Sequence, residues 1–227
     1  MKIYLRTCLL IITPIFFAGS PLPSQDKPDK RLENKWISFD RLSLQSDGRK
    51  WMTVAVQLTP KDHPNKDAAL NEKFIDDIQV DLYLCFKNKT KEKKIFKDTG
   101  RKPQLKETLD YYHAYVEIPT MEVDFRTKTI QFILPIEIAK RDGWDRTQKP
   151  DGYVIEIKMG ETIMPLKDSI AFAVDGKNYR DDEILQNFKR EAIANSSETE
   201  GLLMPAHLVD ASFLNDAPVL KFPKQSY

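Results

Sequence analysis

The side chains best suited to hold a metal ion are scattered along this chain. Its histidines are His63, His113 and His207. None of them has a second ligand at the spacing of a zinc site, which needs pairs such as His-x-x-x-His or Cys-x-x-Cys. Asp76, Asp77 and Asp81 lack the alternating acidic positions, glycine turn and distal glutamate of a calcium loop. The sequence therefore predicts no metal and no cofactor.

Residues capable of nucleophilic or acid–base catalysis are present without a recognisable motif. The chain has no Gly-x-Ser-x-Gly elbow, phosphate loop or dinucleotide glycine fingerprint. Cys85 lies in an alternating apolar stretch, which favours an inert structural thiol over a nucleophile. We therefore expect no enzymatic activity. A hydrolase with an unrecognised acidic site stays open, because a sequence does not show whether two carboxyl groups face one cleft.

Two other sets of side chains could bind a partner. Five lysines crowd the segment Lys87–Lys94, which predicts a solvated strand edge or hairpin tip, with contact to an anionic surface as the alternative. Aromatic residues could form a platform that stacks on sugars, or they could belong to the core and its rim. These residues are Trp51, Tyr111, Tyr112, Tyr115 and Trp144. The net charge of +1 leaves no overall basic excess, so we predict no nucleic-acid binding.

The first twenty residues have the layout of a secretory signal peptide. Lys2 and Arg6 precede an apolar run over residues 8–18, and two small residues follow. The run is shorter than the ~20 apolar residues that a membrane span needs, so we expect no integral span in the mature chain. An uncleaved anchor is the alternative, because a cut after residue 20 would place Pro21 directly behind it.

Cysteine usage indicates the compartment. After processing at residue 20 only Cys85 remains, and a single cysteine forms no internal disulfide. Exported eukaryotic sandwich domains usually carry a disulfide, so we expect the periplasm or the cell surface of a bacterium. Residues 21–34 are rich in proline, aspartate, lysine and serine, which predicts a flexible spacer before the folded domain.

The elements that must position these side chains are mostly strands. Apolar and polar residues alternate over 36–45, 50–59, 78–86, 114–118, 130–138, 153–158 and 170–174. Pro119 and Pro135 interrupt the pattern, which indicates sheet edges or bulges. Strands without helices between them predict an all-β, immunoglobulin-like β-sandwich over residues 35–176. Residues 177–227 are expected to add one helix, Asp181–Asn195, and an irregular apolar tail.

The first hairpin predicts a candidate contact surface. If Asp47 and Gly48 form a two-residue turn, the core face carries Phe39 opposite Val56. The same register places Leu42, Leu44 and Trp51 together on the opposite face, which should be wet. We rank cover by the apolar C-terminal tail first, through residues 202–204 or 219–222. A bulge near residues 40–41 that turns Leu42 and Leu44 into the core ranks second, and an open partner site ranks third.

The overall organisation resembles that of exported immunoglobulin-like proteins associated with type IV pilus gene clusters in gut bacteria. The features that carry this resemblance are the signal-like segment Lys2–Ser20, the sandwich-like region Trp36–Val174, and the helix and apolar tail behind it. The resemblance implies a non-enzymatic interaction module of the envelope, in pilus assembly or adhesion, with a protein partner. A carbohydrate-binding sandwich and an envelope hydrolase are the alternatives.

Overall fold

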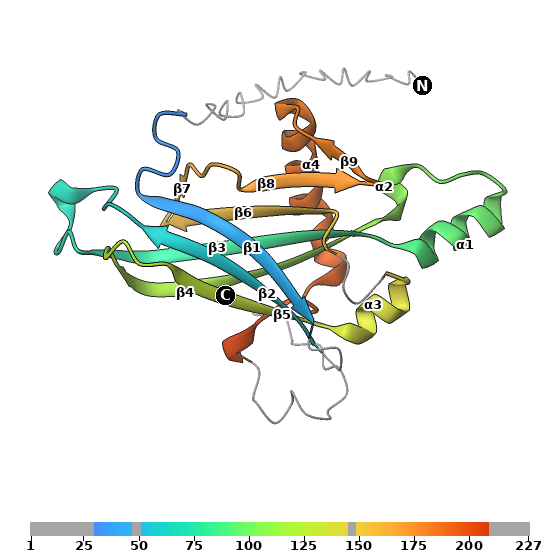
Figure 1. Cartoon of the computed structure of the whole chain (residues 1–227), viewed down its shortest axis with the longest axis horizontal. Coiled ribbons are helices and arrows are strands. Elements are labelled where there is room, and N and C mark those ends of the chain that lie inside the picture. Colours follow the sequence, from blue (N-terminus) through green and yellow to red (C-terminus); the bar gives the residue numbers. More distant parts are fainter. Residues whose placement is uncertain (1–29, 47–50, 145–148, 209–227) are drawn as a thin grey trace, which may run out of the picture.

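The chain folds into two antiparallel β-sheets packed face to face, with helices at one end and on one outer face (Figure 1). The computed structural model describes residues 30–46, 51–144 and 149–208. The predicted all-β sandwich with an added C-terminal helix is confirmed. The predicted signal peptide, most of the predicted spacer, the Asp47-Gly48 turn and the last 19 residues lie outside the described residues.

The order of the strands is that of an immunoglobulin-like sandwich. Sheet A has the order β1 (Ile37–Ser46), β2 (Trp51–Pro60), β5 (Lys128–Pro135) and β10 (Met204–Pro205). Sheet B has the order β4 (Leu109–Glu122), β3 (Phe74–Lys87), β6 (Gly152–Met159), β8 (Ile170–Val174) and β9 (Lys177–Tyr179), and β7 (Thr162–Met164) also pairs with β6. Immunoglobulin-like domains arrange their strands as A-B-E-D against G-F-C with an added C′. Here β1-β2-β5-β10 corresponds to the first sheet and β8-β6-β3-β4 to the second.

The alternating pattern of the sequence decides which face of each strand enters the core. In β2 every second residue is buried, and Val54, Val56 and Leu58 are fully enclosed. β3 supplies Leu82, Leu84 and Phe86 from sheet B to the same core. Pro119 lies inside β4, an edge strand of sheet B, so its predicted place at a sheet edge is confirmed.

Three helices lie between strands, where the sequence analysis predicted none. The predicted strand edge or hairpin tip at Lys87–Lys94 is wrong, because most of this segment belongs to α1 (Lys89–Thr99), which α2 (Leu105–Thr108) follows. The predicted continuation of a strand at residues 136–138 is also wrong, because these residues begin α3 (Ile136–Asp142). Two of these three helices end at a glycine in the left-handed region, which is Gly100 for α1 and Gly143 for α3.

The predicted C-terminal helix is confirmed as α4 (Asp182–Asn195), with the Asp181 side chain accepting hydrogen bonds from two backbone N–H groups of the first turn. Its buried residues Phe188 and Ala192 pack on the outer face of sheet B, against Cys85, Val154 and Phe172 among others. Sheet B is therefore covered on both faces at this end. Short 3-10 helices occur at η1 (Lys66–Ala68), η2 (Ser196–Thr199) and η3 (Ala206–Leu208).

A β-bulge at Asp40 changes the register of the first hairpin. The pairing shifts between Phe39 and Arg41, so that Phe39 lies opposite Leu58 and not opposite Val56. The carboxylate of Asp40 accepts hydrogen bonds from the hydroxyl groups of Ser38 at 3.1 Å and Thr59 at 2.6 Å. These bonds hold the extra residue outside the ladder.

Gly152 sets how closely α4 approaches sheet B. A Cβ atom at this position would lie 2.5 Å from Cζ of Phe188 and 3.0 Å from the carbonyl oxygen of Ala171. We expect Gly152→Ala to push α4 outward and to lower the free energy of unfolding by about 1–3 kcal/mol, measured by urea denaturation. Replacing the ring of Phe188 with the smaller leucine side chain should relieve the clash. The double variant Gly152→Ala with Phe188→Leu should therefore lose less free energy of unfolding than the sum of the losses in the two single variants. Full additivity would contradict this packing.

Candidate functional site

The predicted contact surface does not exist as a single surface. Because of the bulge, Leu42 lies opposite Val56 and Leu44 opposite Val54, and both leucines pack against the main core. Trp51 precedes the buried Met52 in the alternating pattern of β2 and lies on the other face of sheet A. The bulge, which was ranked second, is therefore the explanation for the two leucines, and the register that grouped them with Trp51 is wrong.

Most of the aromatic residues considered for sugar stacking are core residues. Trp144, Tyr111 and Tyr112 are buried. The Trp144 ring stacks on Phe86 with the centroids 3.9 Å apart, and the Tyr112 hydroxyl donates to Asp142 Oδ2 at 2.9 Å. These three side chains therefore form no exposed platform, and the core interpretation holds for them.

A buried charge cluster lies on the outer face of sheet B. Asp81 of β3 has only 2% of its surface exposed. Its Oδ1 lies 2.8 Å from Nε2 of His113, and its Oδ2 accepts from Gln79 Nε2 at 2.8 Å and Lys158 Nζ at 3.0 Å. Burial disfavours the charged form, but the hydrogen bonds from His113 and Lys158 outweigh it and hold the pKa of Asp81 below its ordinary value. The carboxyl group is thus an ionised acceptor and not a proton donor at neutral pH.

A second buried carboxylate joins the same face to α4. Glu156 lies directly opposite Asp81 in the ladder, and its Oε1 lies 2.5 Å from Nζ of Lys189. The Tyr111 hydroxyl donates to Glu191 Oε2 at 3.2 Å, which adds a polar tie between β4 and α4. Lys189 neutralises the Glu156 carboxylate, which burial would otherwise penalise, and both contacts fasten the helix to the sheet.

The Asp81 cluster predicts a pH-dependent stability. We expect Asp81→Asn to lower the free energy of unfolding by about 2 kcal/mol at neutral pH, because the charge-assisted bonds to His113 and Lys158 are weakened. The folded-state pKa lies below the unfolded value of about 3.8, so this stabilisation is present above that value and is lost as the pH falls through the folded pKa. Urea denaturation over a pH series measures both.

The matched control for this prediction is Asp76→Asn, because Asp76 lies on the same strand and is exposed. It should change the free energy of unfolding by less than about 0.5 kcal/mol. A wild-type to Asp81→Asn difference that stays constant down to the lowest pH at which both proteins fold would contradict the ionised, hydrogen-bonded state of Asp81.

Residues 88–108 form a projection at one end of the sandwich, which we name the basic arm. Figure 1 shows its two helices, α1 and α2, extending beyond the ends of the strands. Asn88 begins α1, since its Oδ1 accepts from the backbone N–H of Lys91 at 2.8 Å, and its Nδ2 donates to Asp110 Oδ2 at 2.6 Å. Arg101 makes a two-pronged ion pair with Glu107, at 2.8 and 2.6 Å. The arm is therefore braced by its own polar contacts.

The outward face of α1 concentrates positive charge. The basic arm holds eight lysine or arginine residues and three acidic residues, in a chain whose net charge is +1. Lys89, Lys93 and Lys97 follow one another at i, i+4 and i+8 and therefore share one face of the helix. All three are exposed, and no described residue forms an ion pair with them. Phe96 borders this face with 57% of its surface exposed.

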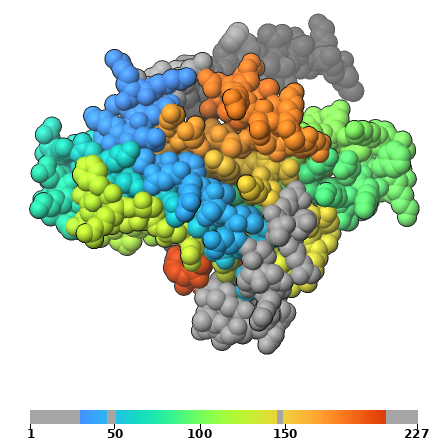
Figure 2. Space-filling view, viewed as in Figure 1, coloured from blue at the N-terminus to red at the C-terminus, as the bar shows by residue number. Residues whose placement is uncertain are grey.

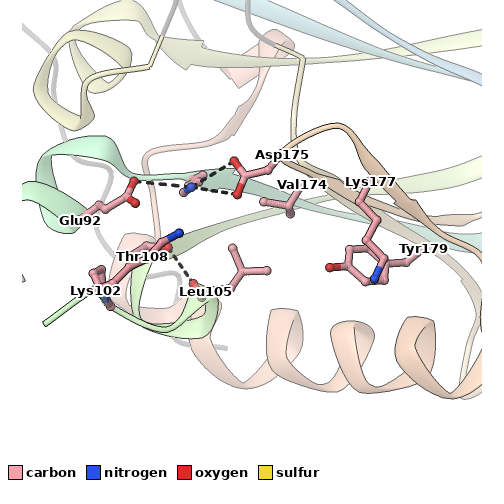
Figure 3. Close-up of a pocket in the computed structure, with 10 residues that line it drawn as sticks. Glu92, Lys102, Leu105, Thr108, Val174, Asp175, Lys177 and Tyr179 are labelled. Carbon is pink, nitrogen blue, oxygen red and sulfur yellow. Dashed lines mark hydrogen bonds and ion pairs between the residues drawn. The ribbon is translucent and has the colours of Figure 1, made fainter.

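A pocket of about 400 Å³ lies between the basic arm and the β8–β9 hairpin. Nζ of Lys87 lies 3.5 Å from Oε2 of Glu92 and 3.1 Å from Oδ1 of Asp175, and Figure 3 labels the two acidic residues among those that line the pocket. Lys102 and Lys177 line the same pocket, and Nζ of Lys177 lies 4.9 Å from the ring centroid of Tyr179. The pocket thus offers the ammonium groups of Lys102 and Lys177, which suit a ligand with an acidic group.

The sequence predicts a cluster of lysines in the arm but not their arrangement on a helix. Asn88 as an N-terminal cap and Gly100 twelve residues later are a helix signal, although the segment between them has no apolar stripe. Cys85 was expected to be inert, and it is buried under α4, where burial raises the pKa of its thiol well above the ordinary value.

Comparisons with known proteins identify no relative. No model of a protein family matches the chain, and neither a curated protein nor a solved structure matches it.

Among the helices that the structure describes, none combines the length and apolar character needed to cross a membrane. Within residues 30–46, 51–144 and 149–208, no three His, Cys, Asp or Glu side chains are grouped so that they could hold a metal ion.

Proposed function

We propose that the protein is a non-enzymatic interaction module of the bacterial envelope, which uses its basic arm to bind an acidic partner protein. The observation that carries the proposal is the outward face of α1, where Lys89, Lys93 and Lys97 lie beside the exposed Phe96. The layout of the N-terminus supports export, and the resemblance to pilus-associated proteins supports a role in assembly or adhesion.

The stability of the fold does not explain the lysine face. Like charges at i and i+4 destabilise a helix by a few tenths of a kcal/mol for each pair. No residue of α1 is buried, so the helix does not contribute a core side chain in return. Attraction to an acidic partner surface offsets this repulsion between lysines. The lysines also accelerate association with such a partner, and the ring of Phe96 supplies an apolar anchor.

The connections of the arm make it suitable for docking. Its first turn is joined to α3 by the hydrogen bond from Thr90 Oγ1 to the carbonyl oxygen of Arg141 at 3.0 Å. Lys91 Nζ lies 3.3 Å from Asp110 Oδ1 at the start of β4. The lysine face is therefore held in a defined orientation relative to the sandwich, which lowers the entropic cost of binding.

Binding of an acidic glycan is the second candidate function, and the pocket beside the arm favours it. Lys102 and Lys177 supply charges for a carboxylate or sulfate group, and the Tyr179 ring, which stacks on Phe172 with the centroids 5.1 Å apart, lies against the Lys177 ammonium group. This differs from the platform considered in the sequence analysis, since Tyr179 was not one of its members.

The lysine face is tested by charge reversal. In the triple variant Lys89→Glu, Lys93→Glu and Lys97→Glu, we expect the affinity for the partner to fall by about tenfold or more, chiefly through slower association. Raising the salt concentration to about 0.5 M should weaken binding of the wild type and leave the variant little affected. Partners are captured in cells by a photo-crosslinking residue at position 96, identified by mass spectrometry, and then measured with purified proteins by surface plasmon resonance.

Two controls make this experiment selective. Lys73, Lys149 and Lys167 are exposed lysines outside the arm, and their joint change to Glu alters the net charge equally but should leave binding intact. A crosslinker at Phe125, which is 70% exposed at the opposite end of the sandwich, should not capture the same partner. Equal binding by both triple variants would overturn the proposal. So would binding only to phosphatidylglycerol vesicles or to an acidic polysaccharide, with no acidic protein captured at position 96.

A further inference from the structure

The connection between β4 and β5 presents an aromatic ring from a strained backbone. Phe125 lies in this connection, with φ at 58° and 70% of its surface exposed. The other four non-glycine residues with positive φ in the described chain are asparagine or aspartate, whose short polar side chains tolerate this region. A bulky aromatic residue tolerates it poorly. Because the exposed ring gains little from burial, the stability of the monomer does not explain a phenylalanine at this position.

Polar contacts hold Phe125 in this conformation. Its backbone N–H donates to the carbonyl oxygen of Pro60 at 3.2 Å. The carboxylate of Asp124 accepts from the backbone N–H of Arg126 at 3.0 Å and from Nζ of Lys128 at 2.7 Å. The ring is thus presented in a defined position, which lowers the entropic cost of binding. A residue that is strained and held in place by its surroundings is typical of a binding site.

An apolar groove of about 480 Å³ lies between β4 and β5, beside this connection. Val116 and Ile118 line the groove from β4, and Ile130 lines it from β5. Ala206 and His207 line it from η3. In Figure 2 the β4–β5 connection (yellow-green) and η3 (red) lie along the same lower edge of the molecule. The exposed ring and the groove are therefore on one side of the protein.

The ring and the groove match in size and chemistry. A cavity of about 150 Å³ lined by apolar side chains binds benzene, so the larger groove has room for a phenylalanine ring. Ile118 and Ile130 are partly exposed in it and would be covered by such a ring. Because ring and groove share one side of the molecule, a two-fold axis can bring each ring to the groove of a second copy. An interface of this kind makes the same contact twice and closes at two subunits.

We propose that two copies of the chain form a dimer in which the ring of Phe125 from each copy inserts into the groove of the other, against Val116, Ile118 and Ile130. Burial of the ring in the dimer offsets the unfavourable backbone conformation at Phe125. None of the contact residues belongs to the lysine face of the basic arm. The dimer therefore presents two lysine faces, which strengthens binding to a partner that carries repeated acidic sites.

Sedimentation velocity of the full-length protein over a range of concentrations tests the proposal. We expect reversible dimerisation of the wild type, and we expect Phe125→Gly to raise the dissociation constant of the dimer by about tenfold or more. Glycine adopts positive φ without strain, so the variant keeps its fold. Leu70→Gly is the matched control and should leave the dissociation constant unchanged. Leu70 is fully exposed at the same end of the sandwich and does not line the groove (Figure 1).

A variant with a filled groove tests the other half of the contact. Ala206→Trp adds bulk from a residue that lines the groove and removes no core side chain, so it should also raise the dissociation constant about tenfold or more. Mixing Ala206→Trp with Phe125→Gly should yield a heterodimer by native mass spectrometry, at a concentration where neither variant dimerises alone. The ring of the first variant then occupies the open groove of the second.

Three results would each overturn the proposal. The first is a wild type that stays monomeric up to about 1 mM, which leaves the groove to another occupant. The second is a dimer that Phe125→Gly weakens no more than Leu70→Gly does. The third is a mixture of Phe125→Gly and Ala206→Trp that forms no more dimer than each variant forms by itself.

Discussion

The burial of β3 on both of its faces is the constraint on which the rest of the structure depends. Leu82, Leu84 and Phe86 point into the core between the sheets, while Tyr83 and Cys85 point into the second core beneath α4. A strand that is buried on both faces has no positions that face solvent. Each polar side chain in it therefore needs a hydrogen-bonding or charged partner in the interior. Asp81 is the buried charged residue of β3, and His113 and Lys158 from the two neighbouring strands meet its carboxylate.

The end of β3 determines where the basic arm begins. Lys87 closes the strand, and Asn88 turns the chain into α1 directly behind it. The position of the arm is therefore set by a strand whose last residues are buried on both faces of its sheet. Its orientation follows from the contacts of Thr90 and Lys91 with the sandwich. The interaction surface that we propose is attached to the core through a few residues. The lysine face can therefore contact a partner beyond the end of the sandwich.

Charge is distributed in two different ways in this protein. Within the sandwich, carboxylates such as Asp81 and Glu156 are buried and closely paired, so their contribution is to position strands and α4. On the arm, Lys89, Lys93 and Lys97 are exposed and form no ion pair with a described residue. The overall net charge of +1 conceals this separation, since it averages the arm with the more acidic remainder of the chain. Local charge, and not the total, is the property relevant to binding.

The sequence by itself determined the strands and the C-terminal helix, because each of these elements follows from the local spacing of apolar and polar residues. Alternation over residues 51–60 and 78–86 follows from sheets with one face in the core, and Asp181 with the stripe through Phe188 and Ala192 specifies α4. Tertiary structure decided what periodicity does not encode. The bulge at Asp40 depends on a hydrogen bond from Thr59 of the neighbouring strand, and one inserted residue moved Leu42 and Leu44 to the other face. The helical state of the lysine segment depends on end caps and contacts with α3, since it has no apolar stripe of its own. The pairing of β10 beside β5 joins segments about 70 residues apart, a contact that only the packing of the two sheets creates.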